Sequence, residues 1–302
     1  MKKVLVTGSN GLLGQKLSDL YHSLPDITFL ATGTGPNRHP IGDALTYASL
    51  DITDATAVMR LFQDFRPDTV IHTAAMTNVD QCEQEKETCW KLNVTALEGI
   101  IAACNEVGTQ LIHLSTDFIF DGTSGPYKEE DEANPISYYG DSKLAGEKLV
   151  MEKAKHWAIA RTVLVYGIVN DMSRSNIVLW AKGALESGKE INVVTDQFRS
   201  PTLAEDLAMG CRLIERKAAH GVYNISGKEF MSVYELVERV AKYWDLSTEN
   251  MHESTSEGIK QPAKRPPITG FILDKAIKDL DYAPHSFEEG LAVLSRQLAV
   301  RG

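Results

Sequence analysis

The sequence has no apolar run close to the ~20 residues that a membrane-spanning helix needs, so we expect no membrane anchor. It has only four cysteines in 302 residues, which is too few for a disulfide framework. Cys82 and Cys89 lie seven positions apart, an interval that matches no common zinc motif. We therefore expect a reducing, cytoplasmic location and no metal site. A basic stretch is also lacking, and the net charge of −10 argues against a nucleic-acid partner.

What the first half does contain is an alternation of short apolar runs with longer helical patterns. Near-continuous apolar strands separated by helices indicate a parallel sheet covered by helices on both faces. We predict an α/β fold: a Rossmann-type doubly wound parallel sheet over residues 1–166, and a smaller C-terminal α/β substrate domain over 167–302. Segments near 191–225 are expected to return to the large sheet. We also expect one long helix over 85–108 and one strand over 156–167.

The stretch "VTGSNGLLG" follows the first predicted strand and opens the first predicted helix. Glycines at this position permit a tight turn, and they let backbone N–H groups approach a pyrophosphate at the helix N-terminus. The motif therefore predicts a dinucleotide site that includes Gly8, Asn10, Gly11, Leu12, Leu13 and Gly14.

The region after the second predicted strand, "FLATGTGPNRH", lacks the acidic residue that reads a ribose 2′-hydroxyl. It contains Arg38, which is suited to a 2′-phosphate, so we predict NADP in preference to NAD. Asp51 and Ile52 fall where an adenine is lined, although Asp51 is equally suited to capping a turn. His72 is expected to be a packed core residue. The small residues after it suit close approach of a cofactor, which adds Ala74, Ala75 and Met76 to the predicted cofactor site.

Polar residues also end the strand in "LIHLSTDFIFDG", which places Ser115, Thr116 and Asp117 at the carboxyl edge of the sheet. Ligands of open parallel sheets bind beyond that edge. A hydroxyl group there can donate a hydrogen bond to a substrate carbonyl oxygen.

Two adjacent tyrosines precede a lysine in "SYYGDSKLAGE". On a helix, residues four apart share a face and residues five apart do not, so Tyr139 rather than Tyr138 is the neighbour of Lys143. Tyr139 is then a candidate general acid. A nearby ammonium favours the phenolate, so we expect Lys143 to lower the pKa of Tyr139 and to bind a cofactor ribose.

The order of these motifs resembles that of the extended short-chain dehydrogenases. With "LDITD", "AAMTNVDQCE", "RTVLVYG", "DQFRSPTLAEDLA" and "KRPPITGFILD", the whole chain is most similar to the dTDP-4-dehydrorhamnose reductase family. Members of that family reduce the 4-keto group of a nucleotide-linked deoxysugar. The resemblance implies a catalytic trio of Thr116, Tyr139 and Lys143. It also implies sugar contacts at Thr77 and Val79, and it matches Asn93 to a helix asparagine of the family.

The sequence departs from the family pattern near the implied sugar site. Phe118 stands where a tyrosine is usual, and Leu164 stands where a tryptophan is usual, so the exact sugar stays open. Arg199 replaces a small residue. Because the chain is net acidic, an anionic nucleotide sugar needs local cations. The candidates are Arg199, Lys264 and Arg265, and we favour Arg265 as the phosphate ligand.

Two other functions compete with a 4-keto reductase. One is a sugar-nucleotide epimerase or dehydratase, although dehydratases of this superfamily carry an acidic pair after the threonine, and here Phe118 follows Asp117. The other is a non-catalytic NADP-binding subunit that resembles the regulatory subunit of methionine adenosyltransferase. A homodimer is compatible with the sequence but is not indicated by it.

Overall fold

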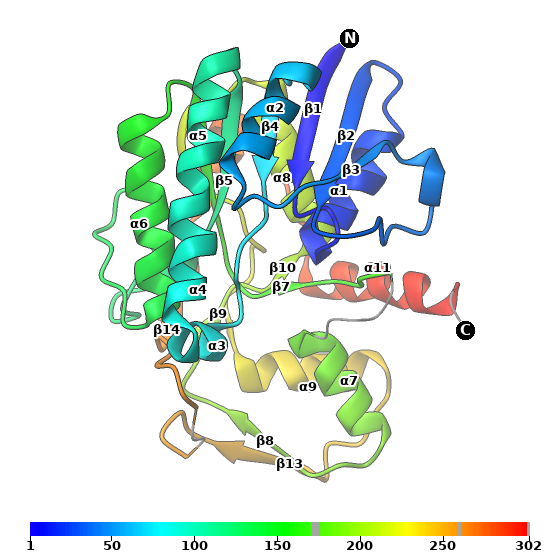
Figure 1. The fold of residues 1–302 in the computed structure, drawn as a ribbon. Coiled ribbons are helices and arrows are strands. Elements are labelled where there is room, and N and C mark those ends of the chain that lie inside the picture. Colours follow the sequence, from blue (N-terminus) through cyan, green and yellow to red (C-terminus); the bar gives the residue numbers. More distant parts are fainter. Residues whose placement is uncertain (171–175, 259–260, 301–302) are drawn as a thin grey trace.

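A computed structural model describes residues 1–170, 176–258 and 261–300. The larger part of the molecule, which we call the large lobe, is built around a seven-stranded sheet with strand order β11-β6-β5-β4-β1-β2-β3 (Figure 1). All of its neighbouring strands pair in parallel. The order reverses beside β1, which confirms the predicted doubly wound sheet. The strands are β1 (Lys2–Thr7), β2 (Ile27–Gly33), β3 (Tyr47–Ser49), β4 (Thr69–His72), β5 (Gln110–Thr116), β6 (Trp157–Thr162) and β11 (Gly221–Asn224).

Helices cover both faces of this sheet, which is why its strands are apolar on both sides. In β1, Val4 and Val6 pack in one core cluster with Leu17, while Leu5 packs in another with Phe62. The first cluster lies under α1 (Leu12–His22) and α8 (Ala204–Arg216), and the second under α2 (Ala55–Phe65) and α5 (Ala96–Val107). Beside α5 lies α6 (Tyr138–Lys153) (Figure 1). No helix in the described ranges has both the length and the apolar character needed to cross a bilayer.

A smaller part, the small lobe, has its own core cluster, formed by residues such as Val178, Leu236 and Leu291. It contains α7 (Ile177–Glu186), α9 (Val233–Tyr243), α11 (Phe287–Ala299) and the pair of strands β8 (Ile191–Val194) and β13 (Met251–Ser254) (Figure 1). Of the segments expected to return to the large sheet, β11 does so beside β6. β8 does not, because Ile191 and Val193 pack in the core of the small lobe.

Short strands join the two lobes. β7 (Val165–Tyr166) pairs with β10 (Thr202–Leu203). A further three-stranded sheet, the junction sheet, has the order β12-β9-β14, with β12 (Met231–Ser232), β9 (Phe198–Arg199) and β14 (Ile268–Thr269). The prediction of one strand over 156–167 is therefore wrong. The chain turns at Leu164, where φ is 42°, and the Thr202 hydroxyl holds the turn by donating to the Val163 carbonyl at 2.7 Å.

The prediction of one continuous helix over 85–108 is also wrong. α4 (Lys86–Trp90) passes into a π-helical turn at Lys91–Thr95 before α5 begins. In that turn the Asn93 side chain forms two hydrogen bonds with the Met76 backbone. Its Oδ1 accepts from the Met76 N–H at 2.8 Å, and its Nδ2 donates to the Met76 carbonyl at 3.0 Å. The predicted end at Gly108 is confirmed, with φ at 75°. Further α-helices of the described residues are α3 (Val79–Gln84) and α10 (Asp274–Leu280).

Candidate active site

Two adjoining cavities lie at the carboxyl ends of the large-sheet strands. The first has a volume of about 400 Å³ and the second about 290 Å³. Residues lining both include Gly8, Gly11, Thr73 and Ala75. The glycine loop after β1 therefore separates one cavity, near the end of β5, from another near the end of β2.

At Gly8, Gly11 and Gly14 the loop after β1 presents backbone, not side chain, to the first cavity. Gly8 has φ of 74°, and a Cβ there would lie 2.7 Å from the Ala74 nitrogen. A Cβ on Gly14 would lie 2.3 Å from the Gly8 carbonyl oxygen, so helix α1 packs directly on the loop. A Cβ on Gly11 would meet only that oxygen, at 3.3 Å. Gly11 is also the N-cap of α1 and makes no side-chain cap, which leaves a backbone cradle of the kind that binds a pyrophosphate at a helix N-terminus.

The second cavity collects the residues predicted to hold the adenosine end of a dinucleotide. Arg38, Asp51 and Ile52 line it, together with Asn10 and Ala74. The Asn10 side chain ties the Arg38 segment to the glycine loop, because its Oδ1 accepts from the Arg38 N–H at 3.0 Å. Asp51 has one of its two suggested roles, the turn cap, and its contact with an adenine stays a prediction. It lines the cavity, and its carboxylate also caps a turn by accepting two hydrogen bonds from Thr53, which lower its pKa.

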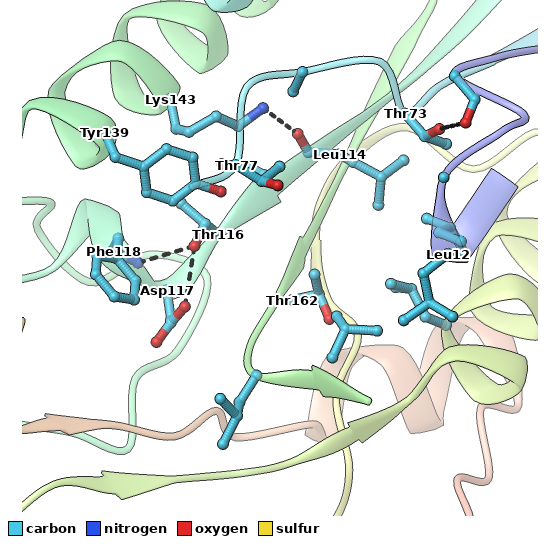
Figure 2. A pocket seen from close by; sticks show the side chains of 18 of the residues that line it. Leu12, Thr73, Thr77, Leu114, Thr116, Asp117, Phe118, Tyr139, Lys143 and Thr162 are labelled. Carbon is cyan, nitrogen blue, oxygen red and sulfur yellow. Dashed lines mark hydrogen bonds between the residues drawn. The ribbon is translucent and has the colours of Figure 1, made fainter. Parts of the chain in front are cut away.

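The first cavity brings Tyr139 and Lys143 together on α6. Both side chains are buried, at 8% and 3% exposure, and both line the cavity (Figure 2). Tyr138 points elsewhere, with its ring beside Trp90 and the Lys86 ammonium. Lys143 Nζ donates to the Leu114 carbonyl at 2.6 Å. Burial lowers the pKa of Lys143 to about 8, so the ammonium still predominates at neutral pH.

The expectation that Lys143 brings the pKa of Tyr139 toward neutrality is wrong. Burial raises the pKa of Tyr139 well above its usual value, and the largest opposing effect is a hydrogen bond with Thr116. Desolvation dominates because a phenolate in this apolar wall loses its hydration. The Tyr139 phenol is therefore protonated at neutral pH, which is the form a proton donor needs.

Thr116 lies at the end of β5 beside these groups, but its hydroxyl is already engaged. Its Oγ1 donates to Asp117 Oδ1 at 3.0 Å and accepts from the Phe118 N–H at 3.2 Å (Figure 2). Asp117 is 2% exposed and lies between the two lobes. The Phe118 ring packs edge-on against Tyr139, with 5.7 Å between ring centroids. The lower wall of the cavity therefore combines a buried carboxylate with an aromatic face.

Most of the predicted substrate residues line the first cavity: Thr77, Val79, Thr116, Phe118, Leu164 and Arg199. Leu12 and Leu13, predicted to bind the cofactor, line it too. The Arg199 guanidinium, however, is engaged by the protein. It donates to the Phe198 carbonyl at 2.7 Å and to the Pro267 carbonyl at 2.9 Å. A further donation reaches the Pro266 carbonyl at 2.7 Å. Arg199 therefore holds the junction sheet to the loop that precedes β14.

Met76, Arg265 and the candidate cation Lys264 line neither cavity. Met76 packs in a small cluster with Tyr139 and the buried thiols of Cys82 and Cys89. Arg265 forms a salt bridge with Asp80, 2.8 Å from Nη2 to Oδ2. No periodicity links Asp80 to a partner 185 positions away, so the sequence reading missed this contact. Thr73 and Thr162, which line the first cavity, were also missed, because a threonine in or after a strand has no distinguishing pattern.

The whole described site lies within one family match. Residues 1–300 match the family model described as "RmlD substrate binding domain". The chain belongs to this family. That membership confirms the resemblance seen in the sequence.

Named relatives of the chain include a polysaccharide biosynthesis protein and a methionine adenosyltransferase subunit. The chain is 33% identical to the spore coat polysaccharide biosynthesis protein SpsK of Bacillus subtilis, over 96% of each chain. It is 34% identical to methionine adenosyltransferase 2 subunit beta of Xenopus tropicalis, over 85% of this chain and 77% of that protein. Among solved structures, dTDP-4-dehydrorhamnose reductase from Bacillus anthracis, in complex with NADP, superposes with a TM-score of 0.84. The two share 30% identity and cover 98% of this chain and 100% of that one.

Proposed function

We propose that this RmlD-family protein is an NAD(P)H-dependent reductase of a nucleotide-linked 4-keto-deoxysugar, similar to dTDP-4-dehydrorhamnose reductase. One observation carries the proposal. Thr116, Tyr139 and Lys143 line a single cavity whose wall is shared with the glycine loop. The similarity to a reductase solved with NADP supports it.

The residues present fit a dinucleotide along the two cavities. The cradle at Gly11 suits the pyrophosphate, and the second cavity with Ile52 and Asp51 suits the adenosine. When bound, the nicotinamide supplies the hydride. Arg38 faces the same cavity and no acidic residue follows β2 before it, so we propose that NADPH is preferred over NADH.

Tyr139 is the proposed proton donor to the keto oxygen. Its phenol is protonated and aimed into the first cavity (Figure 2). The Lys143 ammonium lies in the same cavity wall, so it stabilises the phenolate that remains after proton transfer. Burial of both side chains keeps bulk water away and strengthens their electrostatic interaction with the substrate.

The sugar end of the cavity is proposed to favour a deoxysugar over a fully hydroxylated hexose. Phe118 and Leu164 contribute apolar surface where the family usually has a tyrosine and a tryptophan. Arg265 remains the proposed ligand of the substrate diphosphate, on one condition. It must exchange the Asp80 carboxylate for phosphate oxygens. Arg265→Ala should then raise KM for the sugar nucleotide and leave KM for NADPH unchanged.

The decisive experiment is to screen nucleotide-linked keto sugars for consumption of NADPH and NADH. Tyr139→Phe should lower kcat by ~10²–10⁴-fold, the usual contribution of a positioned acid. Tyr138→Phe is the matched control, because it removes the neighbouring hydroxyl outside the cavity, and it should change kcat little. Equal losses from both substitutions would refute the assignment of Tyr139.

A second candidate function is supported by the 34% identity to methionine adenosyltransferase 2 subunit beta. In that case the chain is a regulatory subunit that binds NADP without turnover. Co-purification with a methionine adenosyltransferase catalytic subunit, and no reduction of any sugar in the screen, would favour it. A cytoplasmic location fits either function, and a homodimer is the oligomeric state we propose to test by light scattering.

A further inference from the structure

Asp117 is a buried carboxylate directly behind the proposed catalytic threonine. Its Oδ1 accepts the Thr116 hydroxyl at 3.0 Å. Its Oδ2 accepts a short hydrogen bond from the Thr269 hydroxyl and lies 3.8 Å from Arg199 Nε. Thr116 and Asp117 belong to the large lobe, whereas Arg199 and Thr269 belong to β9 and β14 of the junction sheet. The carboxylate is therefore held from both sides of the lobe junction.

A hydroxyl group has a single proton, and here it is directed at Asp117. The Thr116 oxygen also accepts from the Phe118 N–H, which leaves it one lone pair for a further donor. Figure 2 shows the Tyr139 hydroxyl beside Thr116, whose own hydrogen bonds run to Asp117 and Phe118. While Asp117 holds the Thr116 proton, Thr116 offers Tyr139 an acceptor and has no proton to donate to a substrate oxygen.

We propose that Asp117 is a positioning residue that fixes the direction of the Thr116 hydroxyl, and that Arg199 and Thr269 hold the Asp117 carboxylate for this role. The proposal rests on the reductase function proposed above. Its consequence is that Thr116 orients the Tyr139 O–H, while Tyr139 alone delivers the proton to the keto oxygen. The orientation of the Tyr139 hydroxyl then depends on the contacts that Arg199 and Thr269 of the junction sheet make with Asp117.

Asp117→Asn is predicted to reverse this arrangement. Arg199 and Thr269 both present donors, so the amide oxygen turns toward them and the amide NH₂ turns toward Thr116. The Thr116 oxygen then accepts from the amide, and its own proton points into the cavity. Tyr139 loses its acceptor without any loss of side-chain volume at position 117.

The kinetic test is a double-mutant cycle with Asp117→Asn, Thr116→Val and the two combined. Each single change should lower kcat by ~10-fold, the effect of losing one hydrogen bond of ~1.4 kcal/mol. Because Asp117 acts only through Thr116, the double variant should also lose ~10-fold and not ~100-fold. Additive losses, or an Asp117→Asn variant with unchanged kcat, would overturn the proposal.

Thr269→Val provides a second variant that keeps the buried charges paired. It should lower kcat while leaving KM for NADPH unchanged, and Thr269→Ser should restore kcat because it retains the hydroxyl. Thr109→Val is the matched control, since Thr109 is equally buried and donates to the Pro67 carbonyl before β5 begins. It should lower thermal stability only. If Thr269→Val and Thr109→Val behave alike, the contact is structural and the proposal fails.

A direct measurement separates this inference from the proposed function. Neutron diffraction of the unsubstituted chain should place a deuteron between Thr116 Oγ1 and Asp117 Oδ1. A deuteron on Thr116 that points into the cavity refutes the positioning role, whatever the chain turns over. Conversely, an absence of turnover with every keto sugar refutes the reductase function but leaves the neutron result decisive for the hydroxyl direction.

Discussion

Replacing Gly11 by valine is expected to weaken NADPH binding while the protein remains folded. The Gly11 backbone is extended, with φ of −84° and ψ of 173°, so valine can occupy it without strain. A Cβ there meets only the Gly8 carbonyl oxygen, at 3.3 Å, which requires a shift of a few tenths of an ångström. The rest of the side chain enters the space that both cavities share. The substitution should therefore obstruct the cofactor cradle and leave the packing of the hydrophobic core unchanged.

The size of the effect follows from the contacts that a side chain at Gly11 displaces. If it prevents one backbone N–H from reaching the pyrophosphate, one charge-assisted hydrogen bond worth ~1.5–3 kcal/mol is lost. At 1.4 kcal/mol per tenfold change in affinity, Kd for NADPH should rise ~10–150-fold. Gly14 offers the contrast. A Cβ at Gly14 lies 2.3 Å from the Gly8 oxygen and 2.5 Å from Ser9 Cα, so Gly14→Ala should destabilise the fold itself.

The assay combines NADPH fluorescence titration with thermal unfolding of the two glycine variants. Gly11→Val should melt within a few degrees of the unsubstituted chain and bind NADPH more weakly. Gly14→Ala should melt at a distinctly lower temperature. A folded Gly11→Val variant with unchanged NADPH affinity would show that the pyrophosphate does not lie on this loop, and the cofactor assignment would fail with it.

Three further predictions test the cofactor preference, the buried ion pair and the buried lysine. Arg38→Ala should raise KM for NADPH and leave KM for NADH unchanged; an unsubstituted enzyme that works better with NADH contradicts this. Glu147→Gln removes the buried carboxylate that pairs with Arg161 at 2.8 Å, and it should lower the free energy of unfolding in urea by ~3–5 kcal/mol. Glu98→Gln, at the exposed pair with Lys153, should lower that free energy by less than ~1 kcal/mol. Burial lowers the pKa of Lys143 from 10.5 to about 8, so between these pH values the unfolded chain binds more protons and the Lys143 contribution to stability rises with pH. Lys143→Met should therefore raise Tm most below pH 8, with a gain that fades toward pH 10.5; a gain independent of pH would count against a buried ammonium.

Those features that depend on neighbours in the chain were predictable from the sequence alone. The glycine loop after β1 follows from the conformations that only glycine permits in a strand-to-helix turn. Tyr139 and Lys143 share a cavity because a four-residue interval on a helix puts two side chains on one face. The parallel sheet follows from strands that are apolar on both sides. Each of these signals lies within about one turn or one strand.

The remaining features were decided by contacts between distant segments. β6 ends at Thr162 because Thr202 holds the turn at Leu164, and the helix before Gly108 contains a π turn whose Asn93 bonds Met76. Arg265, predicted to meet phosphate, pairs with an aspartate 185 positions away. Asp117 binds a threonine 152 positions away. No local period encodes such pairs, because a buried charge selects its partner only when packing brings donor and acceptor together.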